Sequence, residues 1–338
     1  MSWAVALHGG AGDLSRSLDG KPYRDALDAC LQRGVEVVCG RQAPSFAPYS
    51  HLNMATQAAI ETVVALEDCD LFNAGRGAVL NSDGQVEMEA QLMNSDGESG
   101  ACAGLTCVRN PVLAAERVMT KTSHAFLAGP SAEDFAVREG LHTEPRDYFT
   151  TAMRRKQLEI AQHNGSKSAV LDHNIDTENG KAEPVQRESG HGGSHDDGAL
   201  GTVGAVVKDT DGNIAIAVST GGMTNKMPGR VGDSPIVGAG GFASQQAGVC
   251  ATGKGETFFR HSTCAHICAA MEYGELTLQQ ACEAELGKLQ TGDGGVIGVD
   301  SNGKVVFHFV SRGMLRAMEE SSGRRGIGVW GEWVEKNF

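Results

Sequence analysis

The chain has too little positive charge for a protein that binds polyanions. Its 29 lysine and arginine residues are outnumbered by 42 aspartate and glutamate residues, which gives a formal net charge of −13 at pH 7. Binding to nucleic acid or to an anionic membrane needs a basic surface that attracts phosphate groups. We therefore expect no nucleic-acid partner and no membrane partner, and a small molecule or short peptide as substrate.

Long apolar runs are also absent. No stretch of about 18 apolar residues occurs in the 338 residues, and residues 1–8 lack the basic start and apolar run of a secretory signal. The nine cysteines are odd in number and scattered through apolar segments, as at Cys30 and Cys264. This pattern is typical of reduced thiols. The sequence therefore predicts a cytoplasmic protein.

Motifs of several other site classes are missing or incomplete. The chain has no Gly-x-Ser-x-Gly elbow, which counts against an α/β-type serine hydrolase. Residues 248–254 resemble a phosphate-binding loop, but Gly255 stands where a magnesium-binding Ser or Thr is needed. Residues 238–243 match a dinucleotide fingerprint only loosely. His191 and His195 lie in a glycine-rich segment, whereas their spacing would favour a metal site only on a helix.

The hydrophobic pattern predicts strands that flank helices in each half of the chain. Helical spacing of apolar residues occurs at 23–38, 53–67, 113–121, 133–138, 148–163, 257–273 and 277–290. Strands are expected at 3–7, before a glycine-rich turn at 8–12, and at 78–80, 86–92, 101–108, 202–207, 213–220, up to 252, 295–300 and 304–309. This order favours sheets packed inside and helices outside, in a single domain 1–338.

One of these strands follows a segment without an apolar pattern. Residues 165–200 are rich in Gly, Ser, His and Asp, which predicts a flexible linker that ends at Gly201 and Thr202. A threonine hydroxyl is a weak nucleophile without a base, but a threonine that becomes a new N-terminus can use its own α-amine. An α-amine has a pKa of about 7.7 to 8.0, so it is available as a base near neutral pH. Taken alone, this Gly-Thr pair would more simply open a hairpin.

Three threonines in the second half, Thr202, Thr220 and Thr252, stand next to glycines. Glycine lets a backbone N–H approach a ligand, and an N–H beside a hydroxyl can form an oxyanion hole. Arg230 and Asp233 occupy a Gly- and Pro-rich loop between the last two. Arginine can hold a carboxylate with two hydrogen bonds and aspartate can accept from an ammonium, so the pair could bind both charged groups of an amino acid. A surface salt bridge is the alternative interpretation.

Together these features resemble the plant-type L-asparaginases, which are also isoaspartyl peptidases and belong to the N-terminal-nucleophile hydrolases. The matching segments keep the family order outside the linker, and they are 8–12, 66–75, 201–204, 220–226, 229–235, 252–256 and 294–295. The resemblance implies an α+β fold, a four-layer αββα sandwich. It also implies a precursor that cuts itself between Gly201 and Thr202 into an α-chain (1–201) and a β-chain (202–338), and a dimer of such αβ units.

The resemblance assigns catalytic roles to five residues. Thr202 would attack the side-chain amide of L-asparagine, or the carbonyl of a β-aspartyl peptide, through its hydroxyl. Thr220 would hold that hydroxyl, while Thr252 and Gly253 would stabilise the oxyanion. Asn73 resembles a further active-site asparagine of the family.

The resemblance also implies two binding sites. Arg230 and Asp233 would hold the substrate's α-carboxylate and α-amino groups, in a pocket lined by Gly255. A structural sodium ion is the only bound group that the resemblance implies, and no other cofactor is expected. Its ligands would be backbone carbonyls in one loop, those of Leu66, Glu67, Cys69, Phe72, Ala74 and Arg76.

The chain departs from the family pattern at two places. The family usually carries Asp where this chain has Glu89, and residues 309–314 are looser than the usual form. We expect neither place to touch a catalytic residue. Three alternatives stay open: a glycosylasparaginase, a protein-cutting threonine protease, and an inactive relative that only binds. The missing signal argues against the first, and the Arg230 and Asp233 pair argues against the second.

Overall fold

The computed structural model describes residues 2–12, 20–43, 51–163 and 201–337. The predicted linker at 165–200 lies outside these residues, as do His191 and His195. Within the described part of the chain, no helix is both long and apolar enough to cross a bilayer.

Nine strands form the larger sheet, in the order β13-β12-β11-β1-β5-β6-β2-β3-β4. Only β3 and β4 pair in parallel. The strands are β1 (Ala4–Gly12), β2 (Met88–Asn94), β3 (Ser99–Leu105), β4 (Phe126–Ala128), β5 (Val203–Lys208), β6 (Ile214–Thr220), β11 (Gly313–Glu320), β12 (Arg324–Gly328) and β13 (Val334–Asn337). The strand that begins at Val203 is therefore central, because β5 lies between β1 and β6.

A second sheet has four antiparallel strands in the order β10-β9-β8-β7. These are β7 (Gly241–Ala243), β8 (Ala247–Gly253), β9 (Gly294–Asp300) and β10 (Val305–Phe309). The sheet faces the larger one, since the Cys250 thiol of β8 lies 3.5 Å from the carbonyl oxygen of Ala205 in β5.

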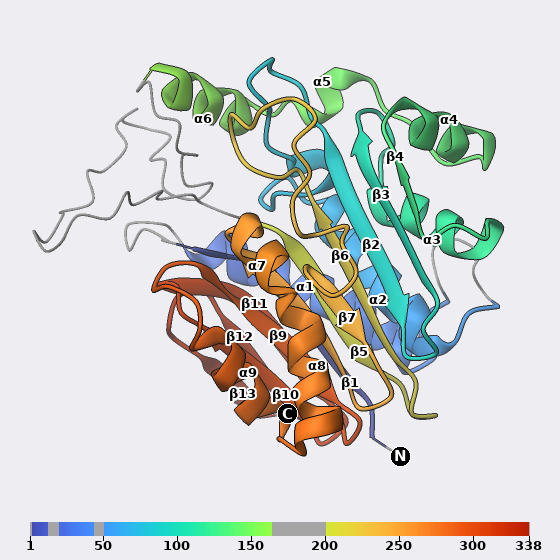
Figure 1. Cartoon of the computed structure of the whole chain (residues 1–338), viewed down its shortest axis with the longest axis vertical. Coiled ribbons are helices and arrows are strands. Elements are labelled where there is room, and N and C mark those ends of the chain that lie inside the picture. The colour runs from blue at the N-terminus through green and yellow to red at the C-terminus, as the bar shows by residue number, and fades with distance from the viewer. Residues whose placement is uncertain (1, 13–19, 44–50, 164–200, 338) are drawn as a thin grey trace, which may run out of the picture.

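Three hydrophobic cores separate the sheets and helices (Figure 1). Because successive side chains of a strand point to opposite faces, Val5 and Leu7 of β1 enter one core and Ala4 and Ala6 enter another. The first core lies between the larger sheet and the helices α1 (Gly20–Val38), α2 (Met54–Glu67) and α3 (Pro111–Lys121). The second lies between the sheets, and the third lies between the smaller sheet and the helices α7 (Gly255–His261), α8 (Thr263–Gly274) and α9 (Leu278–Leu286).

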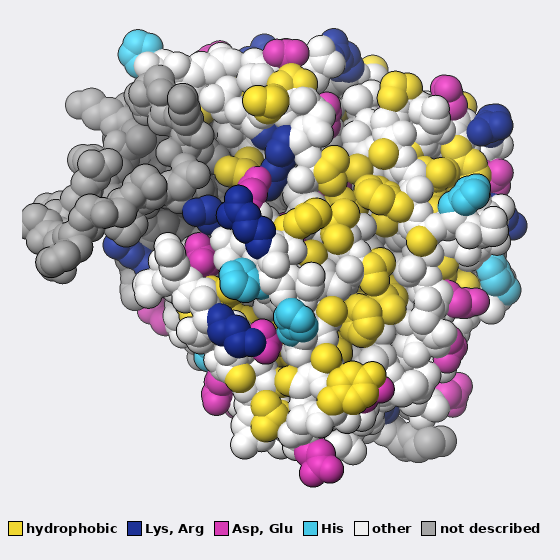
Figure 2. Space-filling view, in the orientation of Figure 1, with side chains coloured by type: hydrophobic (Ala, Val, Ile, Leu, Met, Phe, Trp, Pro, Cys, Tyr) yellow, Lys and Arg dark blue, Asp and Glu magenta, His cyan; other side chains and the backbone are white. Residues whose placement is uncertain are grey.

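The remaining helices lie at the edge of this arrangement (Figure 1). They are α4 (Pro130–Arg138), α5 (Arg146–Phe149) and α6 (Ala152–His163), while the short 3-10 turn η2 (Gly75–Gly77) follows α2 in the chain. Beside α8, hydrophobic side chains gather on the face shown in Figure 2. The large hydrophobic side chains exposed on the smaller-sheet half include Val237, Phe259 and Tyr273.

Several sequence predictions of local structure were wrong. The glycine-rich residues 8–12 continue β1 instead of turning, with a bulge between His8 and Gly10 that the positive φ of Gly10 permits. Residues 78–80 do not form a strand, and the Asn81 side chain closes the turn that follows them by accepting the N–H groups of Asp83 and Gln85.

One further prediction of an element boundary was wrong, and several strands were missed. The helix expected at 257–273 is broken into α7 and α8 at Ser262, which has a left-handed backbone with φ of 45°. The strands β4, β7, β11, β12 and β13 were not predicted. The division into chains 1–201 and 202–338 stays a prediction.

Candidate active site

Thr202 directly precedes β5, a central strand of the larger sheet, and is only 6% exposed. Val203 pairs with Ser219 across β5 and β6. One residue further along the same register, Thr202 and Thr220 come to the same end of the two strands. The sheet therefore brings together two of the three predicted threonines.

Two side chains hold Thr202 in place. The ring Nδ1 of His8 donates to the carbonyl oxygen of Thr202 over 3.0 Å, and the Ser234 hydroxyl lies 3.4 Å from the Thr202 hydroxyl. Burial lowers the pKa of His8 to about 3, so its ring is neutral. His8 and Ser234 were part of matching motifs, but the sequence assigned no role to either. Their role depends on a fold that places β1 and a distant loop against Thr202.

Thr220 and Asn73 belong to one hydrogen-bonded unit. The N–H of Gly222 donates to the Thr220 hydroxyl over 3.0 Å, and the Asn73 side-chain amide donates to the carbonyl oxygen of Gly222 over 2.7 Å. The N–H of Gly221 also donates to the backbone oxygen of Asn73 over 3.2 Å. Asn73 therefore fixes the turn that follows Thr220, and both residues are buried.

Thr252 and Gly253 end β8. The N–H of Ala11 in β1 donates to the Thr252 hydroxyl over 3.2 Å, and this threonine is fully buried. Gly253 has a φ of 148°, and a Cβ there would clash with the backbone oxygen of Asp293. Only glycine fits this backbone, so no side chain at position 253 covers the backbone N–H of Gly253, which directly follows Thr252.

Arg230 and Asp233 lie side by side at one glycine. A Cβ added to Gly255 would lie 2.7 Å from Asp233 Oδ1 and 2.9 Å from Arg230 NH2. Arg230 pairs with Glu256 at 3.0 Å, and Asp233 Oδ2 is buried without a hydrogen-bond partner among the described residues. The alternative of a simple surface salt bridge is wrong, because Asp233 is only 3% exposed. A buried carboxylate oxygen without a partner suits a ligand that brings its own donor.

A chain of contacts joins this pair to Thr202. Ser234, which lies beside the Thr202 hydroxyl, directly follows Asp233. Asp233 in turn faces Gly255, which stands three residues after Thr252. The structure thus gathers the predicted nucleophile, the predicted oxyanion donors and the predicted substrate-binding pair at the same end of the two sheets.

Electrostatics make Asp233 the most strongly perturbed carboxyl group of this cluster. Its pKa is raised to about 7, chiefly by burial and also by the nearby charges of Glu89 and Glu256, while a backbone hydrogen bond at Asp233 itself and the charge of Arg230 act in the opposite direction. The carboxyl group is therefore partly protonated near neutral pH until a cation binds beside it. An ammonium group would favour the ionised form.

The loop at 66–76 is compact, because glycines in and beside it allow backbone carbonyl oxygens to approach closely. Gly75 has a φ of 49°, and a Cβ there would lie 2.5 Å from the backbone oxygen of Glu67. A Cβ on Gly77 would likewise clash with the backbone oxygen of Phe72. Only glycine fits at these two positions, and backbone oxygens are the kind of ligand that a hard cation prefers. Among the described residues, no group of three or more His, Cys, Asp or Glu side chains could hold a metal.

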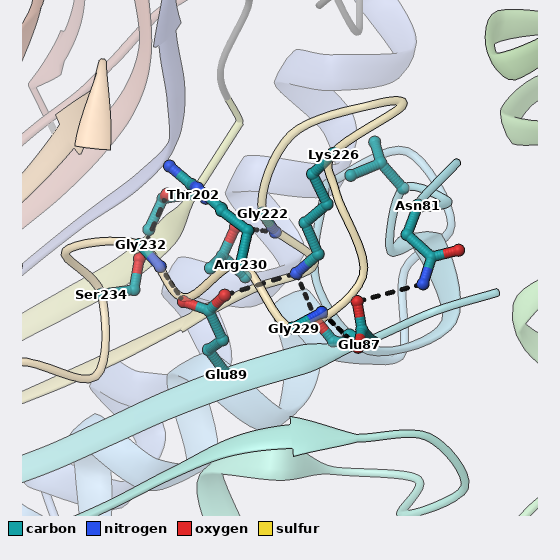
Figure 3. A network of polar contacts seen from close by, with 12 residues as sticks. Asn81, Glu87, Glu89, Thr202, Gly222, Lys226, Gly229, Arg230, Gly232 and Ser234 are labelled. Atoms are coloured by element: carbon teal, nitrogen blue, oxygen red, sulfur yellow. Dashed lines mark hydrogen bonds and ion pairs between the residues drawn. The ribbon is translucent and has the colours of Figure 1, made fainter. Parts of the chain in front are cut away.

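Glu89 is closer to the site than the sequence predicted. It pairs with Thr220 across β2 and β6, and its carboxylate accepts the N–H of Gly232, the residue before Asp233, over 2.9 Å. Figure 3 shows this carboxylate between Gly232 and Lys226. The expectation that the change at this position touches no catalytic residue was wrong, because β2 is the direct neighbour of β6.

Comparison with known proteins agrees with this arrangement. The asparaginase family profile matches residues 1–329. The chain is 40% identical over 337 residues to the isoaspartyl peptidase of Escherichia coli (strain K12), covering 97% of this chain and 96% of the relative. It is 36% identical to the probable isoaspartyl peptidase/L-asparaginase 2 of Arabidopsis thaliana, covering 97% and 99%. It is 38% identical to the isoaspartyl peptidase/L-asparaginase of Homo sapiens, covering 93% and 92%. The predicted resemblance is confirmed, and the chain belongs to the asparaginase family.

Proposed function

We propose that this protein hydrolyses L-asparagine to L-aspartate and ammonia, and cleaves β-aspartyl dipeptides and peptides. The observation that carries the proposal is the partly exposed Arg230 next to the buried Asp233 in the loop that reaches Thr202, with one carboxylate oxygen of Asp233 lacking a partner among the described residues. Such a site suits the free α-carboxylate and α-amino groups that both substrates share. The relatives from Arabidopsis thaliana and Homo sapiens carry both activities in their names, and the relative from Escherichia coli carries the second.

The chemistry would begin with a cut between Gly201 and Thr202. The new α-amine of Thr202 would take the proton of its own hydroxyl as the oxygen attacks the substrate's side-chain carbonyl carbon. Thr252 and the N–H of Gly253 would stabilise the resulting oxyanion. The C–N bond would then break, with the proton passing to the leaving ammonia or amino acid. Water would hydrolyse the ester on Thr202 and release aspartate.

A direct test uses the purified, self-cleaved protein with L-asparagine, a β-aspartyl dipeptide and a glycosylated asparagine. We expect ammonia from the first, a free amino acid from the second, and no reaction with the third. Release of sugar from the third substrate alone would instead identify a glycosylasparaginase. An intact chain that turns over none of them would identify an inactive relative.

We also expect a steep dependence of kcat/KM on pH below about 7. Only the ionised Asp233 accepts charge-assisted hydrogen bonds from the substrate's ammonium, and burial raises its pKa to about 7. The α-amine of Thr202 must also lose a proton, so two groups contribute to the acid limb. As the pH is lowered from 8 to 5, kcat/KM for L-asparagine should fall more steeply in the wild type than in Asp233→Asn. Equal slopes in the two proteins would contradict this role of Asp233.

Three further features belong to the same proposal. The three core clusters support a four-layer αββα sandwich of the N-terminal-nucleophile type. The family membership and the backbone oxygens of Glu67 and Phe72, which pack closely in the loop at 66–76, support a structural sodium ion held there by backbone oxygens. The protein would need no other cofactor.

We further propose a dimer of αβ units in the cytoplasm. The hydrophobic side chains gathered on the face in Figure 2 support a subunit interface, because large exposed apolar areas commonly mark contacts between proteins. All nine cysteines are free, which supports a reducing compartment.

A further inference from the structure

Two glutamates at the start of β2 hold the loop that carries Arg230 and Asp233. The Glu87 carboxylate accepts the N–H of Gly229 over 2.9 Å, and the Glu89 carboxylate accepts the N–H of Gly232 over 2.9 Å. Gly229 directly precedes Arg230, and Gly232 directly precedes Asp233. Each residue of the proposed substrate-binding pair therefore follows a glycine whose N–H is fixed by β2.

Lys226 joins the two anchors. Its ammonium donates to the backbone oxygen of Glu87 over 2.7 Å and lies 3.3 Å from Glu89 Oε1 (Figure 3). The same ammonium lies against the turn that follows Thr220, since a Cβ added to Gly222 would be 2.7 Å from it. Lys226 thus contacts both glutamates that hold the loop and the turn that follows Thr220.

The pair of Glu89 and Lys226 is almost completely buried, with side-chain exposures of 1% and 2%. Removing two charges from water is costly, so a buried ion pair is a poor way to gain stability alone. A role in fixing the position of the neighbouring loop explains this buried ion pair better than a gain in stability does. The length of the Glu89 side chain matters as well, because its two oxygens reach two different partners, Lys226 and Gly232.

We propose that Glu89 and Lys226 are a positioning pair that sets the place of Asp233, and through it the affinity of the site for the substrate's α-amino group. Neither residue would touch the substrate. This inference rests on the proposed function, since it assumes that Asp233 binds the ammonium of an amino acid. It predicts that damage to the pair weakens substrate binding more than it slows the chemical step.

The test compares Glu89→Gln, Lys226→Met and the double variant with the wild type. Glu98→Gln is the matched control, because Glu98 is an exposed glutamate beyond the far end of β2 that accepts from Asn94. We expect KM for L-asparagine to rise about tenfold in each single variant while kcat changes less. In the double variant, KM should rise by less than the product of the two single effects, since no buried charge is left unpaired. The control should keep the wild-type KM.

KM does not depend on the fraction of chains that have self-cleaved, so slow maturation leaves the comparison valid. If Glu89→Gln does not fold, Glu89→Asp keeps the charge but shortens the reach to Gly232, and it should raise KM as well. An unchanged KM together with a lower Tm would overturn the proposal, because it would show a purely structural role.

Calorimetry with L-aspartate separates this inference from the proposed function. We expect the wild type to bind L-aspartate and Glu89→Gln to bind it about tenfold more weakly, in line with the change expected in KM. If the wild type binds L-aspartate, Glu89→Gln binds it more weakly, and the wild type turns over neither substrate, the proposed function fails and the inference stands. If the wild type turns over L-asparagine and both proteins bind L-aspartate equally, the inference alone fails. The inference would also be overturned if the wild type did not bind L-aspartate.

Discussion

The variant Thr202→Ala is expected to stay a single full-length chain and to release no measurable ammonia from L-asparagine. The hydroxyl of Thr202 would be the nucleophile for the cut after Gly201 and for the attack on the substrate, so one substitution removes both reactions. Loss of a nucleophile from a catalytic unit commonly lowers kcat by more than about 10⁴-fold. A denaturing gel measures the cut, and an ammonia assay measures turnover.

The matched control is Thr210→Ala, which removes an exposed threonine hydroxyl from the turn between β5 and β6. This control should self-cleave and turn over L-asparagine like the wild type. Thr202→Ser keeps the hydroxyl and should still self-cleave, although more slowly. Two fragments of the expected sizes in Thr202→Ala would refute the assignment of Thr202.

The three threonines and the pair of Arg230 and Asp233 could be singled out from the sequence, because each lies next to or close to glycines. Thr252 is followed by Gly253, whose φ of 148° excludes other residues, and Asp233 faces Gly255, where a Cβ would clash. Such glycines leave room for a ligand and keep backbone N–H groups accessible, and they are visible in the local sequence motif. The sequence therefore identified the residues beside these glycines.

The supporting contacts could not be predicted in the same way. His8, Ser234 and Glu89 act through partners that lie 194, 32 and 143 positions away along the chain. The pairing of β2 with β6 and of β1 with β5 brings Glu89 and His8 to their partners. No spacing within a short segment contains that information, so the difference between Asp and Glu at position 89 looked unimportant until the neighbouring strand was known.

The C-terminal strands show the same limit for the fold. The segments that form β11 and β12 contain glycines and charged residues and have no long apolar run, so the hydrophobic pattern does not predict them as strands. In the folded chain, β11 pairs with β1, and buried Met314, Leu315 and Ala317 join the cores. Their burial comes from the tertiary arrangement, which overrides local strand preference.

The variant Thr252→Ala should keep the self-cleaved form and KM for L-asparagine but lower kcat by about 10²–10³-fold, the usual effect of losing one oxyanion donor. The N–H of Ala11 already donates to the Thr252 hydroxyl, so the hydroxyl's own proton is free to point toward a developing negative charge. Initial rates over a range of L-asparagine concentrations give kcat and KM separately. Thr252→Ser retains both hydrogen bonds and is the control, with kcat expected within about tenfold of the wild type. If Thr252→Ala kept the wild-type kcat and lost only thermal stability, Thr252 would serve Ala11 alone, and the oxyanion would depend on the N–H of Gly253.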